Sequence, residues 1–279
     1  MRMCRLSIGV TIALLTGAIV GLATGAAARE VSTKTLARAD GGRSPIRVYG
    51  PADGCPPTMV VSHGLGGAED GLSALGNAMS SSGWRVIVMG HPESGGQVLR
   101  SAFWSGDVRN RLIASATDPA LHRARFADLD AAYREATRVC RPKPLLLAGH
   151  SMGAATTMLE AGAKARFGRF GSDRFDAYVA ISPQGVGIFW DHGAWGGIKK
   201  PVLMITGTND KGADGDYTTR LIAFRSLPPG RHRLAVVDGA SHIDLSAAKD
   251  RYGRVISTLV GDFLANRQTA ISGVTTEQK

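Results

Sequence analysis

The amino-acid sequence predicts an α/β fold with a mainly parallel sheet and helices on both of its faces. Strand-like runs alternate with helical ones along the chain, which is typical of such a sheet. Most of the strand-like runs are short and continuously apolar, as expected where both faces of a strand are buried. In addition, Gly149-His150-Ser151-Met152-Gly153 stands between an apolar run and a helical stretch of small residues. This position favours a sharp strand-to-helix turn with Ser151 at its tip.

In chain order, the apolar runs predict seven strands, at residues 46–49, 58–62, 85–89, 145–148, 177–181, 202–206 and 234–237. The helical patterns predict five helices, at residues 71–81, 125–137, 152–165, 217–226 and 247–266. Residues 268–279 are polar and show no periodicity, so a flexible tail is expected there.

The first 28 residues have the pattern of an export signal. Arg2 and Arg5 precede an apolar stretch at residues 8–22, and Ala26-Ala27-Ala28 supplies an A-x-A cleavage site. Small residues rather than a basic stop follow the apolar stretch, which favours cleavage after Ala28 over a membrane anchor. Cleavage predicts a periplasmic or secreted protein with one domain over residues 29–267 and no stable membrane span.

The chain carries a formal net charge of +10, yet its basic residues are dispersed. No run of lysine or arginine is interleaved with aromatic residues, so the sequence argues against nucleic-acid binding. A solvated basic surface is the favoured interpretation, and it is compatible with weak attraction to anionic polymers or envelopes. The sequence does not indicate an oligomeric state.

Two cysteines, Cys55 and Cys140, lie beyond the export signal, and each precedes a predicted strand by a few residues. If these strands are parallel neighbours, both cysteines lie at the sheet edge opposite Ser151. An oxidising compartment permits a bridge between them. We therefore predict a Cys55–Cys140 disulfide, with two free thiols as the alternative.

Two long connections, at residues 91–122 and 183–200, follow strands on the side of the sheet where Ser151 is expected. Long loops with aromatic residues at the carboxyl ends of strands commonly shape a ligand site in open α/β sheets. The alternative is that these rings fill a small core beneath the loops. The candidate pocket residues are Gly64, His91, Phe103, Trp104, Phe189, Trp190 and Trp195.

A serine hydroxyl becomes an effective nucleophile only when a base takes its proton and a third group orients that base. His242 is best placed to be the base, because it follows the last predicted strand and precedes the last helix. His150, inside the turn, is expected to be structural, and His63 to anchor its loop. His91 could line the pocket or hydrogen-bond a loop. The other histidines stand in polar contexts that predict exposure, namely His122, His192 and His232.

The acid that orients the base should follow a strand between Ser151 and His242. Asp210 does so, because it closely follows the apolar run at residues 202–206. Its carboxylate would accept the imidazole N–H and stabilise the charge that develops on the ring. The chain also offers two nearby alternatives, Asp214 and Asp216, and two aspartates that better suit turns or caps, Asp238 and Asp244.

Attack on a carbonyl produces an anionic oxygen that needs hydrogen-bond donors. One donor is predicted to be the backbone N–H of Met152, directly after Ser151. The other should come from His63-Gly64-Leu65-Gly66-Gly67, which follows a strand. The N–H of Leu65 is preferred, with that of Gly64 second. No His, Cys or Asp cluster has metal-ligand spacing, so neither a metal nor another cofactor is expected.

Together, the segment 63–67, Ser151, Asp210 and His242 make the chain resemble the α/β-hydrolase superfamily over nearly the whole of residues 29–267. The glycine-rich segment and residues 84–92 make it similar to dienelactone-hydrolase-like and platelet-activating-factor-acetylhydrolase-like serine esterases. Dienelactone hydrolases themselves use a cysteine nucleophile, so their lactone specificity does not carry over to Ser151. The resemblance implies a mainly parallel sheet of about eight strands, with the site at its carboxyl edge.

These residues predict an exported serine hydrolase that cleaves small-molecule or polymeric carboxylic esters through an acyl-enzyme. A peptidase or amidase, and an acyltransferase, use the same residues and are the alternative enzymes. A binding protein that keeps the fold without the chemistry is the alternative from another class. The sequence does not select among the types of ester.

Overall fold

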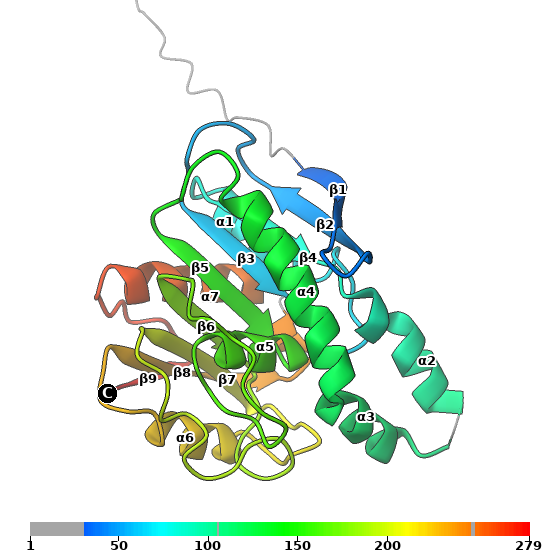
Figure 1. Ribbon diagram of the computed structural model, residues 1–279. Coiled ribbons are helices and arrows are strands. Elements are labelled where there is room, and N and C mark those ends of the chain that lie inside the picture. Colours follow the sequence, from blue (N-terminus) through cyan, green and yellow to red (C-terminus); the bar gives the residue numbers. More distant parts are fainter. Residues whose placement is uncertain (1–30, 105, 247–248) are drawn as a thin grey trace, which may run out of the picture.

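The computed structural model describes residues 31–104, 106–246 and 249–279; the predicted export signal and its cleavage site lie outside these residues. A nine-stranded sheet runs through the molecule in the order β1-β2-β4-β3-β5-β6-β7-β8-β9 (Figure 1). Strands β3 to β8 are parallel to one another. At the two sides of the sheet, β1, β2 and β9 pair antiparallel.

The strands are β1 (Val31–Ala37), β2 (Arg43–Tyr49), β3 (Thr58–Ser62), β4 (Arg85–Met89), β5 (Leu145–His150), β6 (Ala177–Ile181), β7 (Val202–Asn209), β8 (His232–Ser241) and β9 (Val274–Gln278). The α-helices are α1 (Ser73–Ser80), α2 (Gly96–Trp104), α3 (Val108–Thr117), α4 (Pro119–Ala136), α5 (Met152–Glu160), α6 (Thr218–Arg225) and α7 (Asp250–Leu264). Two short 3₁₀ helices are η1 (Pro92–Ser94) and η2 (Asp244–Ser246).

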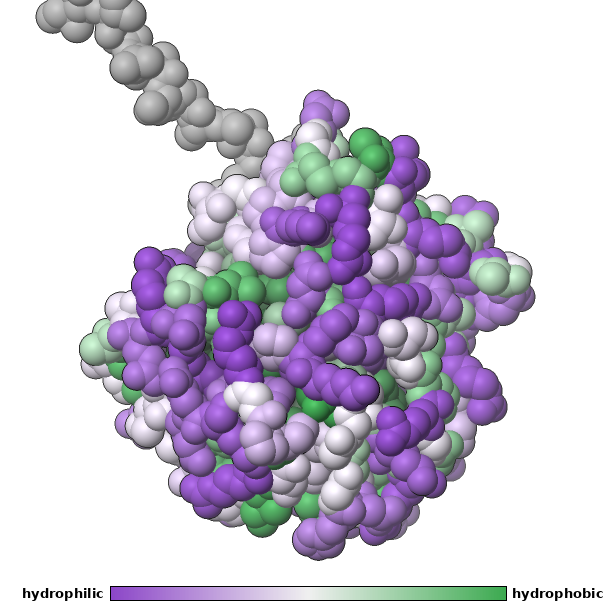
Figure 2. Space-filling model, turned by 60° about the vertical axis from the view of Figure 1, so that its left-hand side comes forward, coloured by the Kyte–Doolittle hydropathy of each residue, from purple (hydrophilic) through white to green (hydrophobic). Residues whose placement is uncertain are grey.

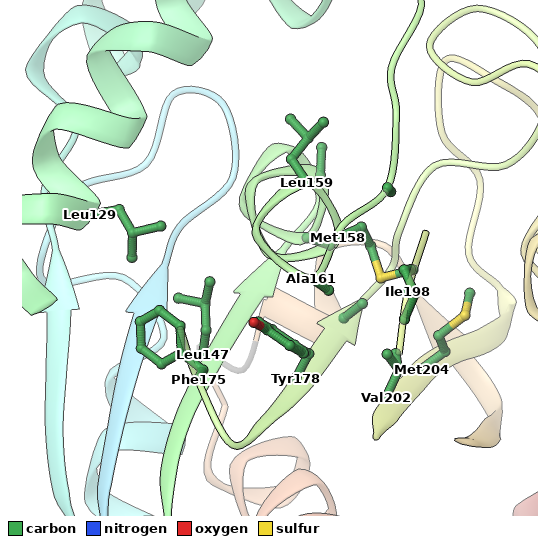
Figure 3. Packing of buried hydrophobic residues seen from close by; sticks show 14 of the residues in the cluster. Leu129, Leu147, Met158, Leu159, Ala161, Phe175, Tyr178, Ile198, Val202 and Met204 are labelled. Atoms are coloured by element: carbon green, nitrogen blue, oxygen red, sulfur yellow. The ribbon is translucent and has the colours of Figure 1, made fainter. Parts of the chain in front are cut away.

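Helices cover both faces of the sheet, and each face has its own hydrophobic cluster. Helices α4, α5 and α6 pack on one face, where Leu129, Met158 and Phe224 join the buried side chains of the strands. Figure 3 shows part of this cluster, with side chains of α4 and α5 lying against those of the central strands. Helices α1 and α7 cover the other face. Burial on both faces explains why β3, β5 and β6 read as continuous apolar runs.

The predicted flexible tail is wrong for its last residues, because residues 274–278 form β9 and pair with β8. Strand β1 was likewise not predicted. Both strands lie at the ends of the sheet order and are largely exposed or half-buried. An edge strand has little apolar surface to bury, so it lacks the alternation that marks a strand in sequence. The sheet therefore has nine strands where about eight were expected.

The connection after β4 is helical rather than an extended loop. Residues 96–104 and 108–117 form α2 and α3, which we call the cap helices, and α4 starts at Pro119. Asp118 caps α4, since its carboxylate accepts the N–H of Ala120 at 2.8 Å. Helix α5 ends at Glu160, earlier than predicted, and Gly162 follows with φ of +111°. A glycine in this conformation is a common helix terminator.

The structure contains the predicted disulfide between Cys55 and Cys140, whose Cα atoms lie 6.1 Å apart. The two cysteines precede β3 and β5, which are adjacent and parallel. They therefore lie at the amino ends of these strands, at the sheet edge opposite Ser151. The bridge links segments separated by 85 residues in the sequence.

The surface that Figure 2 shows is dominated by polar residues, with apolar ones scattered among them. This agrees with the dispersed charge of the sequence. Within the described parts of the chain, no helix combines the length and apolar character needed to cross a membrane.

Candidate active site

Ser151 occupies a strained turn between β5 and α5. Its φ and ψ are 55° and −119°, a region that residues with a Cβ rarely adopt. The turn is held by a hydrogen bond from the N–H of Ser151 to the carbonyl of Ile181, at 2.9 Å. Glycine is required on both sides of it. A Cβ on Gly149 would overlap the carbonyl of Gly153, and a Cβ on Gly153 would overlap the carbonyl of Ser62.

His242 and Asp210 meet at the carboxyl edge of the sheet. Asp210 directly follows β7, His242 directly follows β8, and these strands are parallel neighbours. The Nδ1 atom of His242 lies 2.7 Å from Oδ1 of Asp210, so the imidazole donates to the carboxylate. Asp210 is fully buried, whereas the His242 side chain is 23 % exposed. The carboxylate therefore fixes the ring while leaving part of it accessible.

Positive and polar partners surround the Asp210 carboxylate. The hydroxyl of Thr206 donates to its Oδ2 at 2.9 Å, and Nε of the buried Arg220 lies 3.7 Å from the same oxygen. Burial opposes ionisation of Asp210, but His242, Arg220 and Thr206 more than offset this effect, so the pKa of the carboxyl lies below its usual value. Asp210 is therefore ionised at neutral pH.

His150 supports the backbone of His242. Its Nε2 donates to the carbonyl of His242 at 2.9 Å, and the two rings lie 4.7 Å apart between centroids. Burial lowers the pKa of His150 to about 3, so the ring is neutral. This geometry agrees with the predicted structural role of His150.

The glycine-rich loop after β3 lies beside the turn that holds Ser151. A Cβ on Gly64 would lie 3.3 Å from Cβ of Ser151, which shows how closely the two backbones approach. The loop is fixed by Arg125, a fully buried residue of α4, which donates to the carbonyls of His63 and Gly64 at 2.8 and 3.3 Å. His63 adds a bond from Nδ1 to the carbonyl of Gly64, as expected of a loop anchor.

The two predicted oxyanion donors belong to residues close to Ser151. Leu65 and Met152 both line the same cavity as the serine. Met152 begins α5, and N–H groups in the first turn of a helix have no acceptor within the helix. The N–H of Met152 is therefore suited to bind an anion.

His91 lies beneath the glycine-rich loop and not in the pocket. Its Nδ1 donates to Asp128 at 2.8 Å, and its Nε2 accepts from the hydroxyl of Ser62 at 2.9 Å. Arg125 also donates to the Ser62 hydroxyl, at 3.2 Å. His91, Ser62 and Asp128 are all buried. Of the two roles considered for His91, the structure supports the one in which it hydrogen-bonds surrounding structure.

A cavity of about 360 Å³ opens beside Ser151 and His242. The cap helices supply a largely apolar wall, with Leu99, Leu112 and Ile113. Ile188 and Phe189 extend this wall from the connection after β6. Polar side chains line the cavity as well. The remaining lining residues are Leu65, Ala116, Thr117, Met152, Gln184, Lys211, Gly212, Ala213, Asp214, Arg220 and Ile243.

Only one of the predicted pocket rings, Phe189, lines this cavity. Trp190 and Trp195 are buried in the main hydrophobic cluster on the face that α4, α5 and α6 cover, so they fill the core and not the pocket. Phe103 and Trp104 lie at the end of α2 with 68 % and 89 % of their surface exposed. The prediction was wrong for these four rings. The helical connection after β4 turns its aromatic end outward and uses aliphatic residues at the cavity, whereas the connection after β6 packs its two tryptophans into the core. Gly64 borders Ser151 without lining the cavity.

The predicted exposure is confirmed for His192 but wrong for His122 and His232. His122 lies in α4, where its Nε2 donates to the carbonyl of Ala116 at 2.8 Å and its ring stacks on Phe167. His232 begins β8. Both were misjudged because their elements start earlier than their sequences suggest.

Arg125, Asp128, Arg220 and Gln184 were missed by sequence reasoning. Arg125 and Asp128 bind residues distant in the chain, whereas Arg220 contacts Asp210 ten residues before it. No local motif marks any of the four. Among the residues that the structure describes, no group of three His, Cys, Asp or Glu side chains is arranged to hold a metal ion.

No protein-family model and no curated protein matches this chain in sequence. Solved structures do match. An esterase domain of a Rhodothermus marinus protein is 15% identical with a TM-score of 0.57, over 85% of this chain and 99% of that one. A predicted CIB-like hydrolase from Thermoplasma acidophilum is 16% identical with a TM-score of 0.57, over 85% and 99%. An esterase from Pyrococcus furiosus is 16% identical with a TM-score of 0.57, over 86% and 93%.

At these identities the likeness establishes architecture. The order and direction of the strands, the helices on both faces and these structural neighbours confirm the predicted fold class. The chain has an α/β-hydrolase fold.

Proposed function

We propose that this protein is an exported serine esterase in which Ser151, His242 and Asp210 form a catalytic triad. The observation that carries the proposal is the placement of Ser151. It stands in a strained turn and shares one cavity with His242, which is bonded to a buried, ionised aspartate. A strained backbone at a cavity-lining serine is costly for the fold, and such strain is typical of functional sites.

In the proposed mechanism, Nε2 of His242 takes the hydroxyl proton of Ser151 while Oγ attacks the ester carbonyl carbon. The carbonyl oxygen becomes an oxyanion that the N–H groups of Met152 and Leu65 stabilise. The C–O bond to the alcohol then breaks, and His242 returns its proton to the leaving oxygen. This step releases the alcohol and leaves an acyl group on Ser151.

In the second half, His242 takes a proton from water, whose oxygen attacks the acyl carbon. Collapse of the new oxyanion breaks the bond to Ser151, and His242 returns the proton to Oγ. Asp210 holds Nδ1–H throughout and stabilises the positive imidazolium. The hydrogen bond from His242, together with the buried charge of Arg220, keeps Asp210 ionised for this role.

The cavity supports small-molecule esters with an apolar acyl group as the substrate class. Its volume of about 360 Å³ lies in the range of small-molecule sites, and aliphatic and aromatic side chains form much of its wall. Turnover of p-nitrophenyl esters from acetate through dodecanoate measures the acyl length that fits. We expect an optimum at intermediate length, followed by a decline when the chain exceeds the cavity.

The decisive experiment is labelling with a fluorophosphonate probe followed by peptide mapping. We expect the label on Ser151, and Ser151→Ala should lose ester turnover by roughly 10⁶-fold in kcat. Ser101→Ala, at an exposed serine on α2, is the control and should keep both labelling and turnover. Labelling elsewhere with Ser151 untouched would contradict the proposal. Matched p-nitroanilides measure the competing amidase activity, which we expect to be weaker.

Export is supported by the pattern of residues 2–28 and by the Cys55–Cys140 bridge, since disulfides persist in oxidising compartments. N-terminal sequencing of the protein recovered outside the cytoplasm should begin at Arg29. An intact start at Met1 in that fraction would contradict cleavage.

A further inference from the structure

Arg125 is a buried cation whose hydrogen bonds, within the described chain, all go to uncharged groups. Its guanidinium donates to the carbonyls of His63 and Gly64 at 2.8 and 3.3 Å, and otherwise to two serine hydroxyls. The carboxylate of Asp128, on the same helix, is bonded to other side chains. Burial lowers the pKa of Arg125 to about 9. Burying a cation with no carboxylate bonded to it is costly, so the benefit of Arg125 has to be sought in what its donors hold.

The carbonyl oxygen of Gly64 accepts three hydrogen bonds. Arg125 donates to it at 3.3 Å, Nδ1 of His63 at 2.6 Å and the N–H of Gly67 at 3.2 Å. The Nε2 atom of His63 accepts from the N–H of His91 at 3.1 Å, which leaves the ring proton on Nδ1. Burial keeps the pKa of His63 well below its usual value, so the ring is neutral. Three donors on one oxygen fix the plane of the peptide bond that follows Gly64.

The same peptide carries the N–H of Leu65. It is a trans peptide, since the cis bond that the described chain contains precedes Pro144. In a trans peptide the N–H points opposite to the C=O, so the N–H of Leu65 points away from Arg125. No group of the described chain accepts a hydrogen bond from it, although the next two N–H groups of the loop are bonded. The loop thus keeps one donor free, at a residue that lines the cavity with Ser151.

Resting on the esterase activity proposed above, we propose that Arg125 is a positioning residue that, together with His63, aims the N–H of Leu65 at the oxyanion. Both side chains act through the carbonyl of Gly64 and not on the substrate. Hydrogen bonds are directional, and those to an oxyanion gain strength in the transition state, where the negative charge develops. A peptide free to rotate would lose this benefit while the acyl chain still binds. The cation also polarises the peptide that it contacts, which makes the N–H a better donor.

The test compares p-nitrophenyl hexanoate with its thiono counterpart, in which sulfur replaces the carbonyl oxygen. Sulfur is a weak hydrogen-bond acceptor, so the ratio of kcat/KM for the oxygen ester to that for the thiono ester measures how well the donors serve the oxyanion. Arg125→Met should lower kcat/KM for the hexanoate by about tenfold to hundredfold and the ratio by at least about threefold. Arg123→Met, at an exposed arginine of the same helix, should keep the wild-type rate and ratio.

A second pair of variants acts on the same carbonyl through a different donor. His63→Leu removes the Nδ1 donor and should also lower the ratio. His63→Asn carries an amide that can donate from the same position, so it should keep more of the wild-type ratio than His63→Leu does. Circular dichroism establishes that each variant is folded. Arg125→Lys, which keeps the charge, takes the place of Arg125→Met should that variant not fold, and His63→Leu decides should neither fold.

A wild-type ratio in a folded Arg125 variant or in His63→Leu would overturn the inference, however far the rates had fallen. General loosening of the site lowers the turnover of both esters alike and leaves their ratio unchanged. Wild-type rates in these variants would overturn it as well. A wild type that hydrolyses neither ester would instead overturn the proposed function, and this inference with it.

Discussion

Asp210 holds a negative charge among two hydrogen-bond donors and the buried cation of Arg220, and its chemistry depends on that charge. It accepts Nδ1–H of His242 on one oxygen, while Thr206 and Arg220 approach the other. An amide at this position could present its NH₂ group to Nδ1, which would favour the wrong imidazole tautomer. The geometry of the site would remain while its proton transfer failed.

We therefore expect Asp210→Asn to lower kcat for ester hydrolysis by about 10⁴-fold, with little change in thermal stability. Asp238→Asn is the matched control, because Asp238 is an exposed aspartate that accepts a bond from Thr208 away from the cavity. Steady-state kinetics on one ester measures both variants. Equal activity of Asp210→Asn and Asp238→Asn would remove Asp210 from the proposed mechanism.

At the residue scale, sequence reasoning worked where a motif sits next to a strand end. Ser151, Asp210 and His242 each follow a recognisable apolar run, so the topology of the sheet brings them to one edge. Arg125 and Arg220 could not be found in this way. Arg125 donates to carbonyls more than sixty residues away in the chain, and its helix carries other arginines that look alike in sequence.

At the scale of elements, the turn from β5 to α5 depends on the absence of side chains at two positions. Gly153 packs directly against the carbonyl of Ser62 at the end of β3. Any Cβ there must push α5 away from the sheet. The turn that exposes Ser151 thus requires close packing between elements as well as local backbone freedom.

Gly153→Ala should cost about 3 kcal/mol or more of unfolding free energy, since a methyl group would overlap a fixed backbone atom. Gly261→Ala is the contrasting variant, because Gly261 is exposed in α7 and a Cβ there meets nothing within 4 Å. We expect it to raise stability by about 1 kcal/mol through helix propensity. Urea denaturation followed by circular dichroism measures both. A neutral Gly153→Ala would contradict this account of the turn.

The elements that escaped prediction share a physical cause. Strands β1 and β9 lie at the sheet edges and bury little, so their sequences carry no strong alternation. Helices α2 and α3 pack mainly on each other and around the cavity, and α3 has no fully buried residue. The central strands were predicted at or near their observed bounds because burial on two faces leaves a continuous apolar run. The hydrophobic pattern in the sequence of an element depends on how much of the element is buried. Weakly buried strands and helices therefore have weak hydrophobic patterns.

At the scale of the whole molecule, the Cys55–Cys140 bridge closes a loop that contains β3, α1, β4, the cap helices and α4. The bridge restricts the unfolded chain more than the folded one. It lies at the edge of the sheet opposite Ser151. Its loss should therefore affect folding stability without altering the site.

The double variant Cys55→Ser/Cys140→Ser should lose up to about 4 to 5 kcal/mol of stability by the chain-entropy relation, and Tm should fall by roughly 10 °C. The wild type in reductant should fall to the same Tm, and the double variant should not respond to reductant. Ester turnover at low temperature should persist in both. A wild type whose melting ignores a strong reductant would argue against the bridge.

Burial keeps five histidines neutral, and this makes the stability of the fold depend on pH. Burial lowers the pKa values of His63, His91, His122, His150 and His232 in the folded state. The unfolded chain therefore binds more protons below about pH 6.5, so stability is lost as the pH falls from there. Burial also raises the pKa of Asp128 to about 6, which acts in the opposite direction on a single group.

For His122, burial lowers the pKa to about 4, so the loss extends from about pH 6.5 down to that value. We expect His122→Gln to flatten the fall in unfolding free energy between pH 7 and 4 by at most about 1.4 kcal/mol per pH unit. His192→Gln, at an exposed histidine, should leave the slope unchanged. Denaturant midpoints measured across this range provide the test, and identical slopes for all three proteins would contradict it.

Ser62, His91 and Asp128 join hydroxyl, imidazole and carboxylate in the same order as a charge-relay set, yet they lie in the protein interior. A template that searches coordinates only for this order of atoms would find the arrangement and misassign it as an active centre. Access to solvent distinguishes it: the hydroxyl of Ser62 is already engaged by Arg125 and no substrate can approach it. The set of Ser62, His91 and Asp128 therefore serves as scaffolding, directly beneath the loop that borders Ser151.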